Sequence, residues 1–181
     1  RPWMAEPYFY RAVAKINLDD YAGAEEDATL ALDRNPIYPR AYLLRGIARF
    51  SQKEYASAVA DFRRGLELSP RDTGLQYNLS IALLQDKKYA AADSAATELL
   101  QIDPKNKDAY RVLAQSALER KDTITATRQV DTLLAQDSAY IPAYLLRAQI
   151  AAERKDYPTS IRAIDRVLAL DAGDASLYVN R

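Results

Sequence analysis

The sequence AYLLR occupies residues 41–45 and occurs again, unchanged, at residues 143–147. The two copies lie 102 residues apart, which is three times 34. Steps of 34 residues also connect a column that holds leucine throughout: Leu32, Leu66, Leu100, Leu134 and Leu168. A fixed period of this length is typical of a repeat protein, in which one supersecondary unit is copied along the chain.

Each repeat of 34 residues predicts two helices. In the second repeat, apolar residues recur at helical spacing between residues 42 and 50, and a polar stretch at residues 52–54 interrupts them. A second apolar face follows between residues 55 and 66, and Pro70 marks its end because proline cannot continue a helix. No segment alternates apolar and polar residues over the length of a strand. The expected fold class is therefore all-α, an α-solenoid of stacked antiparallel helix pairs.

The pattern resembles the tetratricopeptide repeat, a helix–turn–helix of 34 residues. The second repeat matches best, with aromatic, small and closing residues at the family's positions: Tyr42, Gly46, Tyr55, Ala58, Phe62 and Pro70. The resemblance implies a right-handed solenoid whose first helices line a concave wall. It implies a single array over residues 1–181, with complete repeats at 5–38, 39–72, 73–106, 107–140 and 141–174. Residues 1–4 and 175–181 then belong to partial repeats of a longer array.

One column departs from the family. Between the two helices the family often has glycine, whereas this chain has Asp19, Lys53, Lys87, Lys121 and Lys155. Glycine reaches a positive φ more easily than any other residue. We therefore expect the turn to be tightened in some other way.

The composition argues against several classes of function. The 25 basic and 25 acidic residues balance to a formal net charge of zero, whereas nucleic-acid binders normally carry a basic face. Without cysteine or histidine the chain has no thiol nucleophile, Ser-His-Asp triad or zinc site of the usual ligands. It contains no Gly-rich phosphate loop, and no apolar run approaches the roughly 20 residues of a membrane span. We expect no enzyme activity, no cofactor, no metal and no nucleic-acid partner, and the compartment stays open.

The family's exposed inner positions predict a binding surface on the first helices. These positions are apolar in the first three repeats and become polar in the fourth. Together with Asn78, which stands where family members hold a ligand's backbone, the candidate partner-binding residues are Phe9, Val13, Leu43, Ile47, Phe50, Tyr77, Asn78, Ile81, Arg111 and Gln115. An apolar stripe of this length usually marks an interaction surface.

Each of these candidates also has a structural interpretation. Neighbouring inner helices, or a segment outside this sequence, cover the stripe in one alternative. In another, Asn78 bonds its own helix, and Arg111 pairs with Asp108 three residues earlier.

Two functions of different classes follow. The first is a non-catalytic protein–protein interaction scaffold that binds a peptide or protein segment in its concave groove. The alternative is a structural or self-associating module of a larger protein, whose groove is filled by its own chain or another copy. A monomer in solution favours the first and a stable dimer the second.

Two arginines are expected to form structural ion pairs. Arg11 and Arg45 stand where the family often has an inward-facing leucine, and a buried guanidinium needs a partner. Asp27 and Asp61 follow sixteen residues later, and where the arginine becomes Leu79 the aspartate disappears too. The fifth repeat has an arginine without that aspartate, and its candidate partners come from other columns: Arg147 with Asp131 or Asp165.

The C-terminal end is expected to expose apolar surface because terminal repeats without a polar cap leave a stacking face uncovered. We predict this surface near Ile164, Val167 and Leu168. Residues 177–181 are expected either to fray or to pack against another copy, which makes a homo-oligomer through uncapped ends possible.

Overall fold

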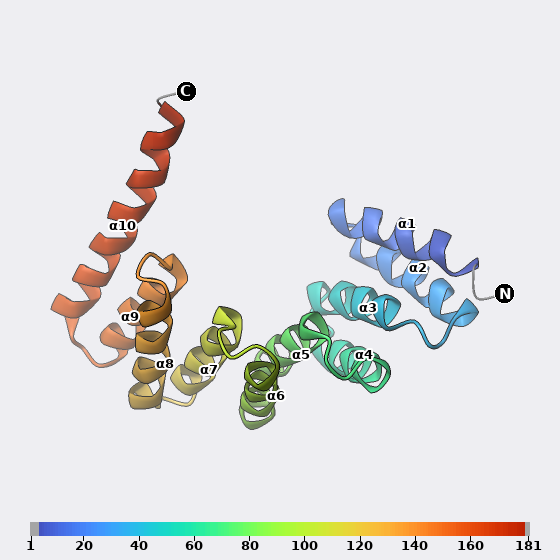
Figure 1. Ribbon diagram of the computed structural model, residues 1–181, viewed down its shortest axis with the longest axis horizontal. Coiled ribbons are helices and arrows are strands. Elements are labelled where there is room, and N and C mark those ends of the chain that lie inside the picture. Colours follow the sequence, from blue (N-terminus) through green and yellow to red (C-terminus); the bar gives the residue numbers. More distant parts are fainter. Residues whose placement is uncertain (1–3, 180–181) are drawn as a thin grey trace. The chain divides into compact units, whose positions relative to one another are not determined.

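The computed structural model describes residues 4–179, and their side chains as far as Asp171. Over this range the chain forms ten α-helices and no strand (Figure 1). They are α1 (Glu6–Asn17), α2 (Tyr21–Arg34), α3 (Pro39–Ser51), α4 (Tyr55–Leu68), α5 (Thr73–Gln85), α6 (Tyr89–Ile102), α7 (Lys107–Glu119), α8 (Thr123–Gln136), α9 (Ile141–Glu153) and α10 (Tyr157–Val179).

Each predicted repeat contains one pair of consecutive helices that contact each other: α1 and α2, α3 and α4, α5 and α6, α7 and α8, α9 and α10. The helices divide between two compact units, Arg1–Pro104 and Lys105–Arg181, here called the N-terminal and C-terminal units. In the N-terminal unit α2 also packs on α3, and α4 on α5. In the C-terminal unit α8 packs on α9. The prediction of one array over the whole chain stays a prediction.

Small residues set how closely the helices of a pair approach. A Cβ built on Gly46 in α3 would lie 2.4 Å from Cε1 of Phe62 in α4, so no larger residue fits there. The repeated alanine column of the second helices is fully buried, with 0% exposure at Ala24, Ala58, Ala92 and Ala126. Because protein interiors are close-packed, these columns determine the spacing of the helix pairs.

The turn column adopts the conformation that glycine would take. Its five residues have φ between 58° and 66°, in the left-handed region. At Lys87 two bonds hold this geometry: Lys87 N–H donates to Leu84 O at 3.0 Å, and Lys88 N–H donates to Leu83 O at 2.9 Å. This pair of bonds satisfies the last carbonyls of α5. The expectation of a different turn was wrong, because the hydrogen bonds enforce the left-handed residue despite its Cβ.

The last helix, α10, is longer than the period predicts. Earlier second helices end near Pro36 and Pro70, but the equivalent position holds Ala172, and α10 continues to Val179. A turn was expected before a new first helix at residue 175, and the structure has none. Without the proline the helix can continue, but the fourth repeat, with Ser138 in this column, still ends α8 at Gln136, so the missing proline alone does not cause the longer helix.

The predicted apolar surface is present on α10. Ile164 and Leu168 are 39% and 60% exposed, and Val167 is half-buried. The prediction for residues 177–181 falls outside the part of the chain whose side chains are described.

Candidate interaction surface

The first helices of successive repeats adjoin in the N-terminal unit, where α1 contacts α3 and α3 contacts α5. The side chain of Asp72 caps the N-terminus of α5 by accepting a hydrogen bond from Leu75 N–H at 2.9 Å. Six candidate residues on these helices are half-buried: Val13, Leu43, Ile47, Phe50, Tyr77 and Ile81. The structure therefore leaves part of each of these side chains accessible on three adjoining helices.

Phe9 does not belong to this accessible set. Its side chain is 2% exposed, with the ring centroid of Tyr38 at 5.0 Å and that of Tyr10 at 5.3 Å. The guanidinium carbon of Arg40 lies 5.0 Å from its ring centroid. The expectation that Phe9 is exposed was wrong, because Tyr10 on the same helix and Tyr38 at the junction of α2 and α3 cover its ring.

Asn78 is half-buried, and its amide is partly used within its own helix. Its Nδ2 donates to Gly74 O at 2.8 Å, which is the structural alternative considered above. That bond uses one of the two amide hydrogens, and Oδ1 accepts no hydrogen bond from the described residues. Asn78 therefore retains one donor and one acceptor.

Arg111 and Gln115 lie on α7, in the C-terminal unit, whereas the other candidates lie in the N-terminal unit. Arg111 pairs with Asp108 through Nε and Oδ1 at 3.4 Å, so this alternative is confirmed. Gln115 donates from Nε2 to Oε1 of Glu119 at 3.0 Å. Both polar candidates therefore have partners on their own helix.

Both predicted arginine–aspartate pairs are present in the N-terminal unit. Arg11 Nε donates to Asp27 Oδ2 at 2.7 Å. Arg45 donates from Nε to Oδ2 of Asp61 at 3.0 Å and from Nη2 to Oδ1 at 2.6 Å. In the C-terminal unit the fifth repeat uses the first of its two candidate partners: Arg147 pairs with Asp131.

The carboxylates, rather than both guanidinium groups, are the buried partners. Asp27 and Asp61 are 1% and 3% exposed. The side chain of Arg45 is 17% exposed, but that of Arg11 is 58% exposed, so the expected burial of Arg11 was wrong. Among the described residues, no helix of an earlier repeat packs on α1, whereas α2 packs on α3. Arg11 of α1 is therefore more exposed than Arg45 of α3.

The hydrogen bond from Arg11 lowers the pKa of Asp27 below its ordinary value, against the effect of burial, which raises it. Lys15 contributes in the same direction, with Nζ 2.9 Å from Oδ2 of Asp27. Asp27 therefore stays ionised in the folded protein although it is buried.

A second basic residue joins each pair, and the sequence reasoning missed it. Lys15 contacts Asp27, and Arg49 contacts Oδ2 of Asp61 at 2.9 Å. Arg49 also bonds Glu25 at 2.8 Å. Burial raises the pKa of Glu25, but the bonds from Arg49 and Gln52 outweigh it and hold this pKa below its usual value. The sequence does contain a signal for this second residue. Lys15 and Arg49 each follow the paired arginine by four positions, and they occupy one column of the period.

Among the residues that the structure describes, none of the helices combines the length and apolar character needed to cross a bilayer. Over the same residues, no three carboxylates gather closely enough to hold a metal ion.

Two sequence models, both described as Tetratricopeptide repeat, match the chain at residues 10–73 and 49–115. Together they span residues 10–115, which is more than half of the sequence. Among curated proteins, none matches the sequence.

Several solved structures share the fold at low sequence identity. MamA from Desulfovibrio magneticus RS-1 is 18% identical, with a TM-score of 0.82 over 93% of this chain and 96% of that one. A tetratricopeptide repeat protein from Parabacteroides merdae ATCC 43184 is 19% identical, with a TM-score of 0.76 over 97% of this chain and 72% of its own. YrrB, described as a TPR protein with an unusual peptide-binding site, is 16% identical, with a TM-score of 0.71 over 92% and 86%.

The 34-residue period, the ten helices of the described region and the two sequence models agree. The chain belongs to the tetratricopeptide repeat family, with the helix pairs of an α-solenoid.

Proposed function

We propose that this chain is a non-catalytic scaffold for protein–protein interaction, which binds a peptide or protein segment along the first helices of the N-terminal unit. The observation that carries the proposal is the set of half-buried apolar side chains on α1, α3 and α5: Val13, Leu43, Ile47, Phe50, Tyr77 and Ile81. Burying apolar surface of a partner contributes about 25 cal/mol per Å², before the cost of ordering both chains.

Asn78 adds a polar contact to this apolar surface. Its remaining amide hydrogen and its Oδ1 provide one donor and one acceptor, which suits the N–H and C=O of a peptide backbone. YrrB, which has the same fold, is described as having a peptide-binding site, and this supports the proposal.

The test is affinity capture from an extract of the native organism, with partners identified by mass spectrometry. Ile47→Asp places a charge in the centre of the proposed surface, and Asn78→Ala removes the polar contact. Leu145→Asp is the matched control, because Leu145 occupies the same column as Leu43 and is 48% exposed but lies in the C-terminal unit.

We expect partners captured by the parent protein to be lost with Ile47→Asp, weakened with Asn78→Ala and retained with Leu145→Asp. Circular dichroism must show parental helix content for each variant. If correctly folded Ile47→Asp and Asn78→Ala proteins capture every partner of the parent, the ligand does not bind on this surface.

The second candidate function is self-association, and the exposed apolar side chains of α10 favour it. Ile161 and Leu168 are 61% and 60% exposed there. Ile164 is 39% exposed, whereas the equivalent residues Val130 and Phe62 are 1% and 0% exposed. At the position of Ile164, the second helices α4 and α8 bury an apolar side chain that α10 leaves accessible.

Light scattering after gel filtration tests this candidate. Self-association predicts a dimer or larger species that Leu168→Asp converts to monomer. A parent protein that stays monomeric at high micromolar concentration eliminates the candidate.

A further inference from the structure

In the second and fifth repeats, a tyrosine reaches backward to the turn that precedes the repeat. The hydroxyl of Tyr42 donates to Pro36 O at 3.1 Å, and that of Tyr144 donates to Ser138 O at 3.0 Å. Tyr42 and Tyr144 occupy the same column, as do Pro36 and Ser138. Because the acceptor is a backbone carbonyl, the contact does not depend on which side chain stands in the turn. The second and fifth repeats thus hold a tyrosine ring at equivalent positions, each by a hydrogen bond to a backbone carbonyl.

In the third repeat this column holds Gln76, which does not make the equivalent contact. Gln76 is 3% exposed, and its Nε2 donates to Ala95 O at 3.0 Å and to Glu98 Oε2 at 2.8 Å. Both amide hydrogens are therefore directed to α6. Among the described residues, no donor reaches Oε1 of Gln76.

A cavity of about 590 Å³ lies at this position, between α4, α5 and α6. Its walls include Leu66, Pro70, Gln76, Leu79, Leu83 and Ala95. Pro70 occupies the column of Pro36 and Ser138, so its carbonyl is equivalent to the acceptors of Tyr42 and Tyr144. The volume is within the range of about 300–1,000 Å³ that ligand pockets in proteins have.

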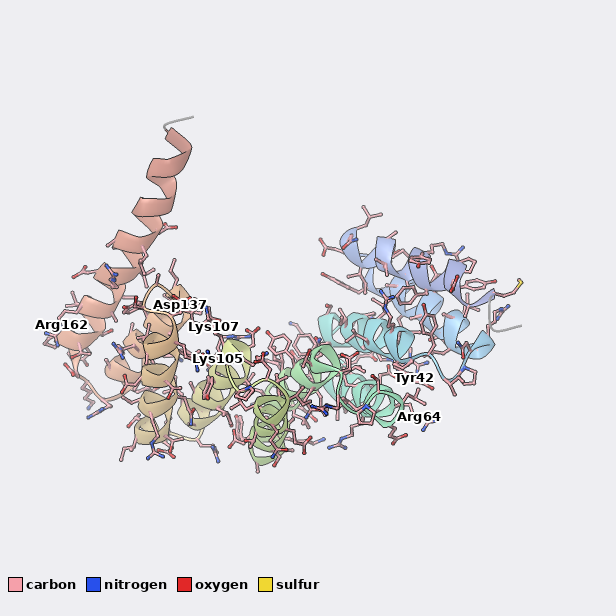
Figure 2. The ribbon with its side chains drawn as sticks, in the orientation of Figure 1. Tyr42, Arg64, Lys105, Lys107, Asp137 and Arg162 are labelled. Carbon is pink, nitrogen blue, oxygen red and sulfur yellow. The ribbon has the colours of Figure 1, made fainter. Side chains whose placement is uncertain are left out.

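The cavity exists because the third repeat replaces large side chains by smaller ones. In the second repeat, α3 and α4 fill this space with Tyr42 and with the pair of Arg45 and Asp61. The equivalent residues of the third repeat are Gln76, Leu79 and Ala95. At the rim the change continues: Arg64, labelled beside Tyr42 in Figure 2, becomes Glu98. The replacements leave an apolar floor at Leu79, Leu83 and Ala95, and the charged side chains of Arg63, Glu67 and Glu98 also line the cavity.

We propose that this cavity is a binding site for a tyrosine side chain of a partner protein. The ring packs on Leu79 and Leu83, in the place that Tyr42 fills in its own repeat. The hydroxyl donates to Pro70 O, and a backbone N–H of the partner donates to Oε1 of Gln76. The site lies on the side of the second helices α4 and α6, and it is independent of the surface on α1, α3 and α5 proposed above.

The test uses p-cresol, the isolated side chain of tyrosine, titrated into the intact chain and followed by ¹H–¹⁵N NMR. We expect saturable shifts at Leu79, Ser94 and Ala95, with a Kd on the order of millimolar for a ligand of this size. Toluene has the same ring and methyl group but no hydroxyl, and it is expected to bind at least about tenfold more weakly because it leaves the Pro70 carbonyl unpaired.

Two variants fill the cavity from inside. Gln76→Tyr supplies the ring that the other repeats have, and Ala95→Leu fills the same space from α6 if the first variant does not fold. Either folded variant should abolish the p-cresol shifts, because its added side chain occupies the space that the ring needs. Gln85→Tyr, at an exposed position of the same helix, and Ile47→Asp, on the other surface, should leave p-cresol binding unchanged.

The proposal is overturned by any of three results. These are the absence of saturable shifts in the parent, equal binding of p-cresol and toluene, or unchanged binding by a folded cavity-filling variant. None of them depends on whether the surface of the first helices binds a partner, so the two proposals fail separately.

Discussion

The second and third repeats are neighbours in the N-terminal unit, and equivalent positions of the two carry side chains of different chemistry. In the second, Arg45 and Arg49 share the carboxylate of Asp61. In the third, the residues equivalent to Arg45 and Asp61 are Leu79 and Ala95, which are 7% and 4% exposed. One helix pair is therefore supported by a charged network and the next by apolar packing.

The comparison shows that the fold does not require a particular interaction between the helices of a pair. A buried ion pair loses hydration, and its mutual attraction does little more than offset that loss. Removing one member is different, because it leaves an uncompensated charge in a place that water hardly reaches. The two repeats should therefore respond very differently to single substitutions and similarly to matched double ones.

The largest effect is expected from Asp61→Ala. This change leaves Arg45 and Arg49, whose side chains are only 17% and 23% exposed, without their shared partner. The free energy of unfolding should fall by about 3 kcal/mol, measured by urea denaturation. Asp131→Ala is the control, because Asp131 is 58% exposed and its removal should change stability by less than about 1 kcal/mol. Equal losses in the two variants would contradict the role of burial.

Converting the second repeat to the chemistry of the third should recover much of that loss. The double change Arg45→Leu with Asp61→Ala removes both charges of the pair, while Arg49 keeps Glu25. A double-mutant cycle should give a coupling free energy of at least about 1 kcal/mol between the two positions. Additive losses would mean that the ion pair contributes nothing beyond its separate residues.

The first repeat provides a pH test of the same interaction. The pKa of Asp27 is lower in the folded protein than in the unfolded chain. Between these two pKa values the unfolded chain binds more protons, so the free energy of unfolding decreases as the pH is lowered. The contribution of Asp27 is present above its unfolded pKa, near 4, and is lost as the pH drops through the lower folded pKa. Asp27→Asn should therefore show a smaller loss of urea midpoint than the parent protein between pH 6 and about pH 3. The exposed Asp33→Asn variant, on the same helix, should follow the parent.

The turns provide the smallest effect, and here the two repeats should agree. Lys53 and Lys87 have φ of 66° and 58°, where a Cβ is strained. Replacing either by glycine should raise the free energy of unfolding by about 0.5–1 kcal/mol, after the larger chain entropy of glycine is subtracted. Lys88→Gly is the control, because Lys88 has φ of −87° and gains no relief from strain. A loss of stability in Lys87→Gly would show that the lysine side chain contributes more than the strain removes.

The amino-acid sequence alone determined the features that repeat. The period of 34, the helix pairs and the pairing of Arg11 with Asp27 and Arg45 with Asp61 all follow from columns that vary together. Such columns are readable because equivalent residues meet equivalent neighbours in each helix pair, so a change at one position is matched at its partner.

The tertiary structure alone decided how much water each side chain meets. Phe9 stands in an exposed column of the family but is enclosed by Tyr38, and Arg11 stands in a buried column but remains largely exposed. The cavity beside Gln76 depends on residues from three helices, and no single column of the repeat predicts it. The physical reason is that the period records what neighbours have in common, whereas burial is set by the side chains that surround each position and by the helices that cover it.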